Sequence, residues 1–438
     1  MFVCTTAICT FLCVCIFLDA DWKHFLKAAQ WSLCSCHDRA QLVETVCSKW
    51  RSERNPNHVL PCLSVRTAFD LFLRVMNYSP GTEIVMSAVT IPDMLRIVRA
   101  HRLRVISLDI DMETMAPKIH LLDALVTEHT KVLVVASIYG RRFDMGPVVS
   151  AARHHGLIVI EDCAESFGGF DYLGYEGADL ALFSFGPIKH HTAFGGAIAK
   201  VRCKDLYEKM SAVYGIDPVQ PRLEYLKKII KYAIAYILLD CPRVIKPGMY
   251  ITRLLNIDHK KYIISMLRGF PEKLMVKLRQ RPCDALLAVM ALRLNEVDPT
   301  GISLSNLKHD YVIERLPATV TQVGAKAEVR NHWLFPIVVV SAVHCLCAVH
   351  CSCALVIPLA LLCCLFNVTA AVSGLNFVMA CHGYSAKMVY SDFDTMLFSF
   401  CGCTGTEAKF YPSSHGTHNL LWLRIGASCI AGHALLYY

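Results

Sequence analysis

The feature that most constrains the fold is a regular alternation of short apolar runs and amphipathic runs between residues 56 and 215. Most of the short runs have the length and the valine, isoleucine and leucine content of buried strands. They lie at 83–87, 104–108, 132–137, 157–161, 180–183 and 197–201. Runs with helical periodicity lie between them, at 66–77, 92–102, 119–127 and 145–155. This alternation predicts an α/β fold with an open, largely parallel sheet.

The composition divides the chain into an ordinary middle and two unusual ends. Of the 438 residues, 54% are hydrophobic and only 18% are charged. A soluble domain usually carries about a quarter charged residues, so the low charge excludes a disordered chain and suggests a membrane contribution. The net charge of +8 is dispersed along the chain, which argues against a nucleic-acid partner.

Cysteines are concentrated at the two ends. Of the 22 cysteines, seven lie in residues 1–50 and ten in residues 341–438. They do not recur in pairs at zinc-finger spacing, so we expect no metal site.

The apolar ends predict membrane segments. Residues 2–18 carry no charge, which favours an uncleaved anchor over a signal peptide or a buried N-terminus. Residues 331–386 contain no Asp, Glu, Lys or Arg. The apolar stretch 335–366 within them fits a transmembrane hairpin, a single anchor, or sequence foreign to the fold. We therefore expect a membrane-associated protein with its middle section in the cytoplasm.

The same patterns predict five regions along the chain. They are a possible transmembrane anchor at 1–18, a linker or helical segment at 19–55, an α/β domain at 56–215, a helical region that begins a smaller domain at 216–336, and an apolar tail at 337–438.

Residues with carboxylate, amine and hydroxyl side chains follow the predicted strands. Asp162 comes directly after one run, Ser184 and Lys189 follow the next, and a hydroxyl-rich segment at 64–68 begins the first helix. Pyridoxal phosphate (PLP) needs a lysine for its aldehyde, a carboxylate for its ring nitrogen, and a helix N-terminus with small hydroxyls for its phosphate. Taken singly, each residue is more often a cap or a solvated side chain; their order and their placement at strand ends favour a PLP site.

Five short motifs resemble the DegT/DnrJ/StrS family of PLP-dependent sugar aminotransferases. They are SVRTAFDLFL, SPGTEIVMSAVT, VIEDCAES, FSFGPIK and FGGAI, and the resemblance is good over about residues 58–215 and thin over 220–336. It implies the type I aminotransferase fold, whose large domain has three α/β/α layers. It makes residues 56–215 the PLP-binding domain.

The resemblance also implies roles for individual residues. Lys189 is implied to form the Schiff base with PLP and to move the proton, and Asp162 to pair with the ring nitrogen. The other implied cofactor contacts are Glu165 near the ring, Ser184 and Ser64 with the backbone of Arg66 and Thr67 at the phosphate, and Ile91 near the ring face.

The implied reaction moves an amino group from an amino acid, in this family glutamate, to a nucleotide-linked keto-sugar in a homodimer. Three departures keep other functions open: Val65 stands where the family has glycine, Glu165 replaces a neutral residue, and the apolar tail replaces the expected small domain. The alternatives are a catalytically impaired, membrane-attached scaffold, or another PLP-dependent reaction such as sugar dehydration.

Overall fold

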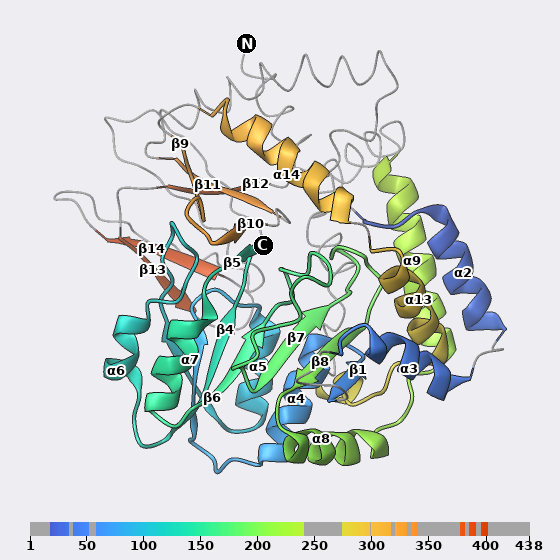
Figure 1. Ribbon diagram of the computed structural model, residues 1–438, viewed down its shortest axis with the longest axis horizontal. Helices are drawn as coiled ribbons and strands as arrows, with labels where there is room; N and C mark the ends of the chain where they lie inside the picture. The colour runs from blue at the N-terminus through green and yellow to red at the C-terminus, as the bar shows by residue number, and fades with distance from the viewer. Residues whose placement is uncertain are drawn as a thin grey trace, which may run out of the picture. The chain divides into compact units, whose positions relative to one another are not determined.

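The structure is a computed structural model, and it describes most of the first 340 residues and three short segments beyond them (Figure 1). The described residues are 18–34, 38–51, 58–240, 274–297, 299–316, 320–330, 334–339, 377–381, 385–390 and 396–401. The chain divides into two compact units, Met1–Leu307 with Lys326–Trp333 and Lys308–Ala325 with Leu334–Tyr438. Each unit is considered by itself below.

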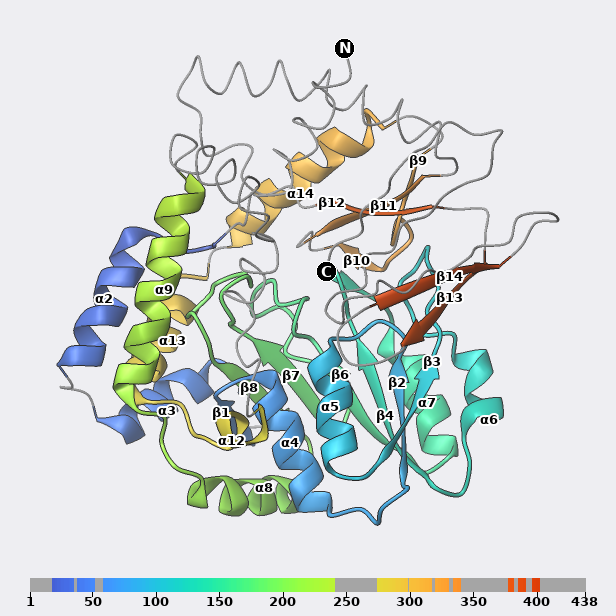
Figure 2. The same cartoon turned by 180° about the vertical axis from the view of Figure 1, so that it is seen from behind.

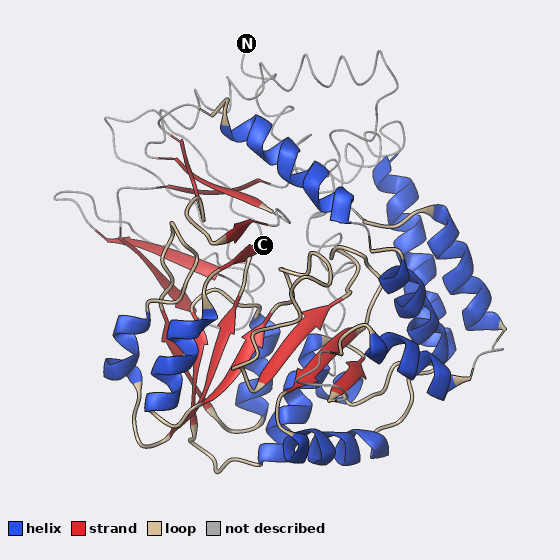
Figure 3. Cartoon of the chain, in the orientation of Figure 1, coloured by secondary structure: helices blue, strands red, loops and turns tan. Residues whose placement is uncertain are grey.

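A seven-stranded sheet forms the centre of the first unit (Figure 3). Its spatial order is β1-β8-β7-β6-β4-β2-β3, and β8 alone among these strands runs antiparallel to its neighbours. The strands are β1 (Val59–Cys62), β2 (Glu83–Ser87), β3 (Arg104–Leu108), β4 (Thr130–Ala136), β6 (Ile158–Asp162), β7 (Leu180–Ser184) and β8 (Ala197–Val201). Six of them match the predicted runs to within two residues at either end. The strand at 197–201, expected in a largely parallel sheet, is the antiparallel exception.

The strand β1 was not predicted, because its four residues include a proline. Pro61 has no backbone N–H to donate, and proline inside a sheet is confined to edge strands, bulges and strand starts. Here β1 lies at the edge of the sheet, where it pairs with β8 alone.

Alternate residues of the inner strands belong to two separate hydrophobic cores. Ile84 and Val134 pack in one core, whereas Val85 and Leu133 pack in the other. Because successive strand residues point to opposite faces, the sheet is covered on both sides. Figures 1 and 2 show α7 on one face and α4 with α5 on the other. The three-layer α/β/α arrangement is therefore confirmed.

The four predicted helices begin and end within two residues of the expected boundaries, and a further helix, at Lys204–Ile216, was not predicted. The helices flanking the sheet are α4 (Val65–Met76), α5 (Pro92–Ala100), α6 (Leu122–Leu125) with the preceding 3-10 turn Ile119–Leu121, α7 (Met145–His154) and α8 (Lys204–Ile216). A side chain caps two of them: Ser64 accepts a hydrogen bond at the start of α4, and Asp144 does so at the start of α7.

A cluster of helices packs beside β1 and β8 in the same unit. It contains α2 (Trp22–Leu33), α3 (Arg39–Ser48), α9 (Arg222–Asp240), α12 (Leu274–Leu278) and α13 (Asp284–Asn295). The helix α13 contacts α2, α3 and α9, and nine of its twelve residues are buried. An apolar sequence without a polar face is what a helix surrounded by neighbours requires. The unit also contains the short pair β5 (Arg141–Arg142) and β10 (Val329–Arg330).

The second unit contains a small mixed sheet and a two-stranded pair. The sheet has the order β12-β11-β9, formed by β9 (Val320–Gln322), β11 (Phe335–Val339) and β12 (Phe377–Cys381). The pair is β13 (Ser385–Tyr390) with β14 (Met396–Cys401). The helix α14 (Pro299–Ile313) begins in the first unit and ends in the second.

The predicted transmembrane segments find no support. No helix among the described residues is long and apolar enough to cross a bilayer. Phe335–Val339, at the start of the apolar run 335–366, is the strand β11 and not a helix, because it pairs with both β9 and β12. Residues 2–17 and 340–376 lie outside the described residues.

Candidate active site

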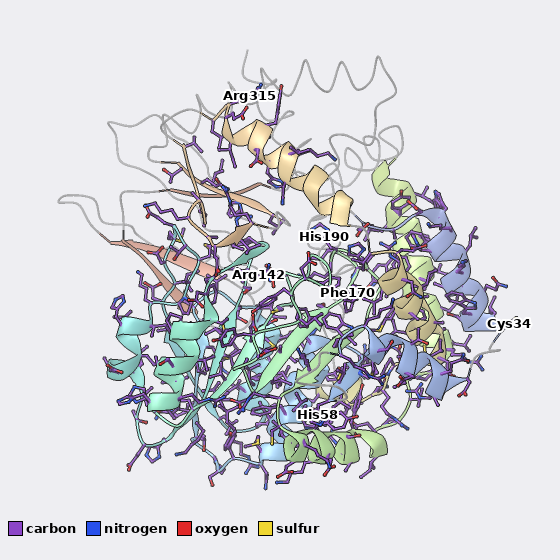
Figure 4. All side chains as sticks on the ribbon, in the orientation of Figure 1. Cys34, His58, Arg142, Phe170, His190 and Arg315 are labelled. Atoms are coloured by element: carbon purple, nitrogen blue, oxygen red, sulfur yellow. The ribbon has the colours of Figure 1, made fainter. Side chains whose placement is uncertain are left out.

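Neighbouring parallel strands bring the candidate residues to one edge of the central sheet. Ala136, the last residue of β4, pairs with Asp162 of β6, which pairs in turn with Leu182 of β7. Figure 4 shows Arg142 and His190, which follow β4 and β7 along the chain, at this same edge. The carboxyl ends of strands in open α/β sheets are where ligands bind, so this edge is the candidate site.

Asp162 ends β6 in surroundings that disfavour its charge. Burial raises the pKa of its carboxyl to about 6; a hydrogen bond from the Ala164 N–H opposes the rise, nearby Glu165 adds to it, and Lys189 opposes it. The Ala164 N–H donates to Oδ1 at 3.0 Å, and no other hydrogen bond to this carboxylate is found among the described residues. A buried carboxylate of this kind is stabilised by a cation placed against it.

Lys189 forms an ion pair with Glu165. Its Nζ lies 3.3 Å from Glu165 Oε1, and the two side chains are only 15% and 17% exposed. The other carboxylate oxygen of Glu165 accepts a hydrogen bond from the Tyr139 N–H at 3.0 Å. Glu165 therefore joins the segments that follow β4, β6 and β7, and its charge balances that of the lysine.

A small pocket brings several predicted residues together. It is lined by Ala164, Glu165, Phe167, Ser184, Lys189 and His190. Three of these, Glu165, Ser184 and Lys189, were predicted as cofactor contacts. Burial lowers the pKa of His190, with nearby Lys189 adding to the effect and Asp19 opposing it. The pocket thus contains a lysine amine, a hydroxyl and a neutral imidazole.

The start of α4 is connected to this edge through the backbone. Ser64 Oγ accepts a hydrogen bond from the Thr67 N–H at 3.1 Å, so it serves as the helix cap. The preceding residue, Leu63, accepts a bond from Gly196, whose carbonyl in turn accepts a bond from Phe185, each at 3.0 Å. The Ala68 N–H donates to the Ser64 carbonyl at 3.1 Å. The start of a helix is where backbone N–H groups can bind an anion.

Val65 stands where the resemblance implies a glycine. Val65 is the first residue of α4, and its side chain is buried in the hydrophobic core. The guanidinium of Arg66 forms an ion pair with Asp93 in the first turn of α5. Ile91, directly before α5, is 42% exposed. The ion pair between Arg66 and Asp93 thus links the start of α4 to the start of α5.

The loop from Phe185 to Gly196, here called the lysine loop, has a strained backbone. His191 and Phe194 adopt positive φ angles of 51° and 60°, and a non-glycine residue in this region costs about 1–3 kcal/mol. Internal hydrogen bonds support the turn: the Thr192 hydroxyl donates to the Gly186 carbonyl at 2.7 Å and accepts from the Phe194 N–H at 2.9 Å. Strain of this kind is common at functional sites.

Gly196 is required where the lysine loop rejoins β8. Its φ is +87°, and a Cβ there would lie 2.5 Å from Met290 Sδ. We expect Gly196→Ala to lower the free energy of unfolding by about 2 kcal/mol or more, measured by chemical denaturation. Gly215→Ala is the matched control, because a Cβ at that position in α8 meets nothing within 4 Å; it should leave stability equal or higher. Equal losses in the two variants would contradict this explanation.

The donor set fits PLP better than a metal ion. A buried carboxylate with a raised pKa, an amine, a hydroxyl and a helix N-terminus lie at one sheet edge. Over the described part of the chain, no group of three or more His, Cys, Asp or Glu side chains could hold a metal. The adjacent pair His154 and His155 is no exception, since His155 is bonded to Asp123.

Several contributors to the site were not predicted from the sequence, among them Tyr139, Asp19 and Arg293. Tyr139 lies three residues beyond β4, so the rule applied to the other strand ends would have found it. Asp19 and Arg293 contact the lysine loop. They lie 172 and 101 residues from their partners in it, and no sequence pattern connects such positions.

Comparison with known proteins supports the resemblance. Residues 43–224 match the model of the DegT/DnrJ/EryC1/StrS aminotransferase family. The chain is 32% identical over 166 residues to a GDP-perosamine synthase of Caulobacter vibrioides, covering 37% of this chain and 44% of that protein. It is 31% identical over 142 residues to UDP-N-acetyl-3-dehydro-alpha-D-glucosamine 3-aminotransferase of Acidithiobacillus ferrooxidans, covering 32% and 38%. The chain thus matches less than half the length of these relatives.

Solved structures support the fold. DesI, crystallised in the presence of its TDP-sugar product, aligns with a TM-score of 0.50 at 17% identity, over 73% of this chain and 70% of that one. The E. coli GDP-4-keto-6-deoxy-D-mannose-3-dehydratase aligns with a TM-score of 0.51 at 16% identity, over 74% and 78%. At such identities the likeness shows the fold alone. The motifs, the strand-end geometry and the family match agree that residues 43–224 of this chain are similar to the DegT/DnrJ/EryC1/StrS aminotransferase family.

Proposed function

We propose that this protein is a PLP-dependent aminotransferase that moves an amino group from an amino acid to a nucleotide-linked keto-sugar. The observation that carries the proposal is the convergence of Asp162, Glu165, Ser184 and Lys189 at adjacent strand ends, inside the segment that matches the family. The remaining parts of the proposal rest on the relatives, two of which are named as acting on GDP- or UDP-linked sugars.

When bound, PLP would supply an aldehyde that reacts with an amine and a ring that withdraws electrons from the reacting carbon. Lys189 supplies the amine, and the same group can hold or release a proton at the substrate carbon once it is free. Its position at the pocket, with its side chain mostly removed from water, suits both roles.

Asp162 would bind the ring nitrogen. Its carboxylate is destabilised by burial, so a protonated ring nitrogen offers the cation it lacks. The pairing would hold the proton on the ring and keep the ring oriented against the end of β6.

The start of α4 and the Ser184 hydroxyl would hold the phosphate. The N-terminal end of the helix dipole favours an anion. The Thr67 and Ala68 N–H groups donate to the Ser64 hydroxyl and carbonyl, so the phosphate would lie against the very start of the helix, at Val65 and Arg66.

An amino-transfer assay tests the function. The full chain, loaded with PLP, is incubated with L-glutamate and UDP-N-acetyl-3-dehydro-glucosamine or a GDP-linked keto-sugar, and the products are identified by mass spectrometry. An amino-sugar product with 2-oxoglutarate supports the proposal. A deoxy-sugar product would instead identify a dehydratase, and absence of any product across the panel would favour the second candidate.

The second candidate is a catalytically silent member of the family. The observation that favours it is the ion pair between Lys189 and Glu165, which occupies the amine with a carboxylate. Homodimer formation and membrane attachment are further proposals that the sequence raises; gel filtration and sedimentation without detergent test them.

The same ion pair leads to a prediction about the rate of cofactor capture. Glu165→Gln should increase the rate at which the Lys189 amine reacts with PLP by about 3-fold or more, because the ammonium loses its carboxylate partner. Glu208→Gln, which removes a carboxylate 3.6 Å from Lys204 on the surface of α8, is the control. The rate is followed by visible absorbance after mixing; a slower reaction in Glu165→Gln would contradict the prediction.

A further inference from the structure

The lysine loop is held by side chains that lie outside the segment shared with the family. Arg293 of α13 donates from Nε to the Thr192 carbonyl at 3.1 Å. Asp19, before α2, accepts the His191 N–H on Oδ2 at 2.5 Å. The consecutive residues His191 and Thr192, two and three positions beyond Lys189, are therefore each held through the backbone by a different side chain.

Arg293 and Asp19 also bind each other. Arg293 Nη2 donates to the Asp19 carbonyl oxygen at 2.6 Å and lies 3.3 Å from its carboxylate Oδ1. The arginine side chain is only 7% exposed. Removing one partner of a buried guanidinium is destabilising, because the charge is left partly unpaired. Arg293 and Asp19 therefore act together, and the pair is here called the clamp.

A second set of contacts, with Glu296 and His24, holds the other end of the Arg293 guanidinium. Arg293 Nη1 donates to Glu296 Oε2 at 3.1 Å, and the same oxygen lies 2.7 Å from His24 Nε2. His24 Nδ1 accepts the Asp21 N–H at 2.8 Å, so the ring proton lies on Nε2 and is donated to Glu296. Although burial opposes ionisation of Glu296, the His24 and Lys23 contacts lower its pKa to about 2.

The backbone strain explains why the loop needs such support. His191 and Phe194 are left-handed on either side of Thr192 and Ala193. Besides the clamp, the Tyr225 hydroxyl of α9 donates to the Ala193 carbonyl at 2.8 Å. A strained backbone persists only where its surroundings over-determine it, and here the surroundings are supplied by α9, α13 and the segment before α2.

We infer that Arg293 and Asp19 are positioning residues that set where the Lys189 amine stands relative to the ends of β6 and β7. The inference rests on the proposed function for its chemistry, but the mechanical part stands on the contacts alone. It makes the segment before α2 and the helix α13, both outside residues 43–224, part of the site.

The test compares Arg293→Met with Arg74→Met in the full chain. Arg74 also makes a partly buried, bidentate ion pair, but away from the lysine loop: its Nη1 and Nη2 donate to Asp217 Oδ2 and Oδ1 at 2.7 and 3.0 Å. Two readouts are taken: the amount of PLP fixed on Lys189 by borohydride, read by peptide mass mapping, and the hydrogen exchange of the amides in residues 190–195. Arg293→Lys, which keeps the charge but not the several donors, should give intermediate values.

We expect Arg293→Met to reduce labelling of Lys189 by 10-fold or more and to speed exchange in residues 190–195 by 10-fold or more, with Arg74→Met near the wild type in both. Equal effects in the two variants, or faster exchange with unchanged labelling, would overturn the positioning role. If the wild type itself takes no label, the proposed function fails. The hydrogen-exchange rates of residues 190–195 then test by themselves whether the clamp holds the lysine loop. If Arg293→Met does not fold, Asp19→Ala replaces it, since this change removes the His191 contact and keeps the carbonyl that Arg293 binds.

Discussion

Replacement of Lys189 by alanine is expected to lower the rate of amino transfer by about 1,000-fold or more. The change removes both the amine that reacts with the cofactor and the group that holds the transferred proton, and general acid–base catalysis alone is typically worth about 100- to 10,000-fold. Single-turnover assays with glutamate and a nucleotide-linked keto-sugar measure the loss.

Stability separates this loss from unfolding. The partner left behind, Glu165, is only 17% exposed but keeps its hydrogen bond from the Tyr139 N–H, so the free energy of unfolding should fall by about 1–3 kcal/mol and the variant should remain folded in the assay. Lys204→Ala on α8 serves as the control and should be fully active. Wild-type rates in Lys189→Ala would show that the reaction does not pass through this lysine.

Asp162→Asn should stabilise the cofactor-free protein while it damages cofactor binding. Burial raises the pKa of Asp162 to about 6, above its unfolded value near 3.8. Between these values the folded state binds more protons than the unfolded state, so stability falls as the pH rises through this window. At pH 8 the ionised carboxylate costs about 1–2 kcal/mol, allowing for partial exposure. Asp162→Asn should therefore raise the free energy of unfolding by that amount at pH 8 and leave it unchanged at pH 4.

The same substitution should weaken PLP binding by about 10-fold or more, because an amide cannot balance a protonated ring nitrogen. Asp179→Asn is the matched control. Asp179 also lies at the sheet, but Arg153 and Arg202 pair with it and, against the effect of burial, lower its pKa. That variant should be less stable at pH 8 and should leave PLP affinity near the wild type. Destabilisation by Asp162→Asn at pH 8 would contradict the account.

Much of the first unit could be predicted because its signals are local. Buried parallel strands are continuous apolar runs, so β2, β3 and β4 were found from composition and length alone. The strand-end rule then selected Asp162, Ser184 and Lys189 without any knowledge of their partners. The edge strand β1 was missed because Pro61 breaks its pattern, although an edge position accommodates it.

The rest depends on contacts between distant residues. That Arg66 would be committed to Asp93, and that Val65 would face the core, follows from how α4 and α5 pack, which a single sequence does not reveal. Arg293 lies in a helix whose apolar sequence predicts only that the helix is buried. Its contact with Asp19 joins residues 274 positions apart. Phe335–Val339, at the start of the apolar run, could not be predicted as a strand for a related reason: hydropathy is local, but whether these five residues pair as a strand depends on β9 and β12.

The central claim is that Lys189 is the residue that takes up PLP. The most direct test is the visible absorption spectrum of the full chain mixed with PLP, followed by borohydride reduction and peptide mapping. The account predicts an absorption band that reduction removes, with the label on Lys189 and none on Lys200, whose side chain β8 also buries. A folded protein that shows no such band, or that carries its label on another lysine, would contradict the account.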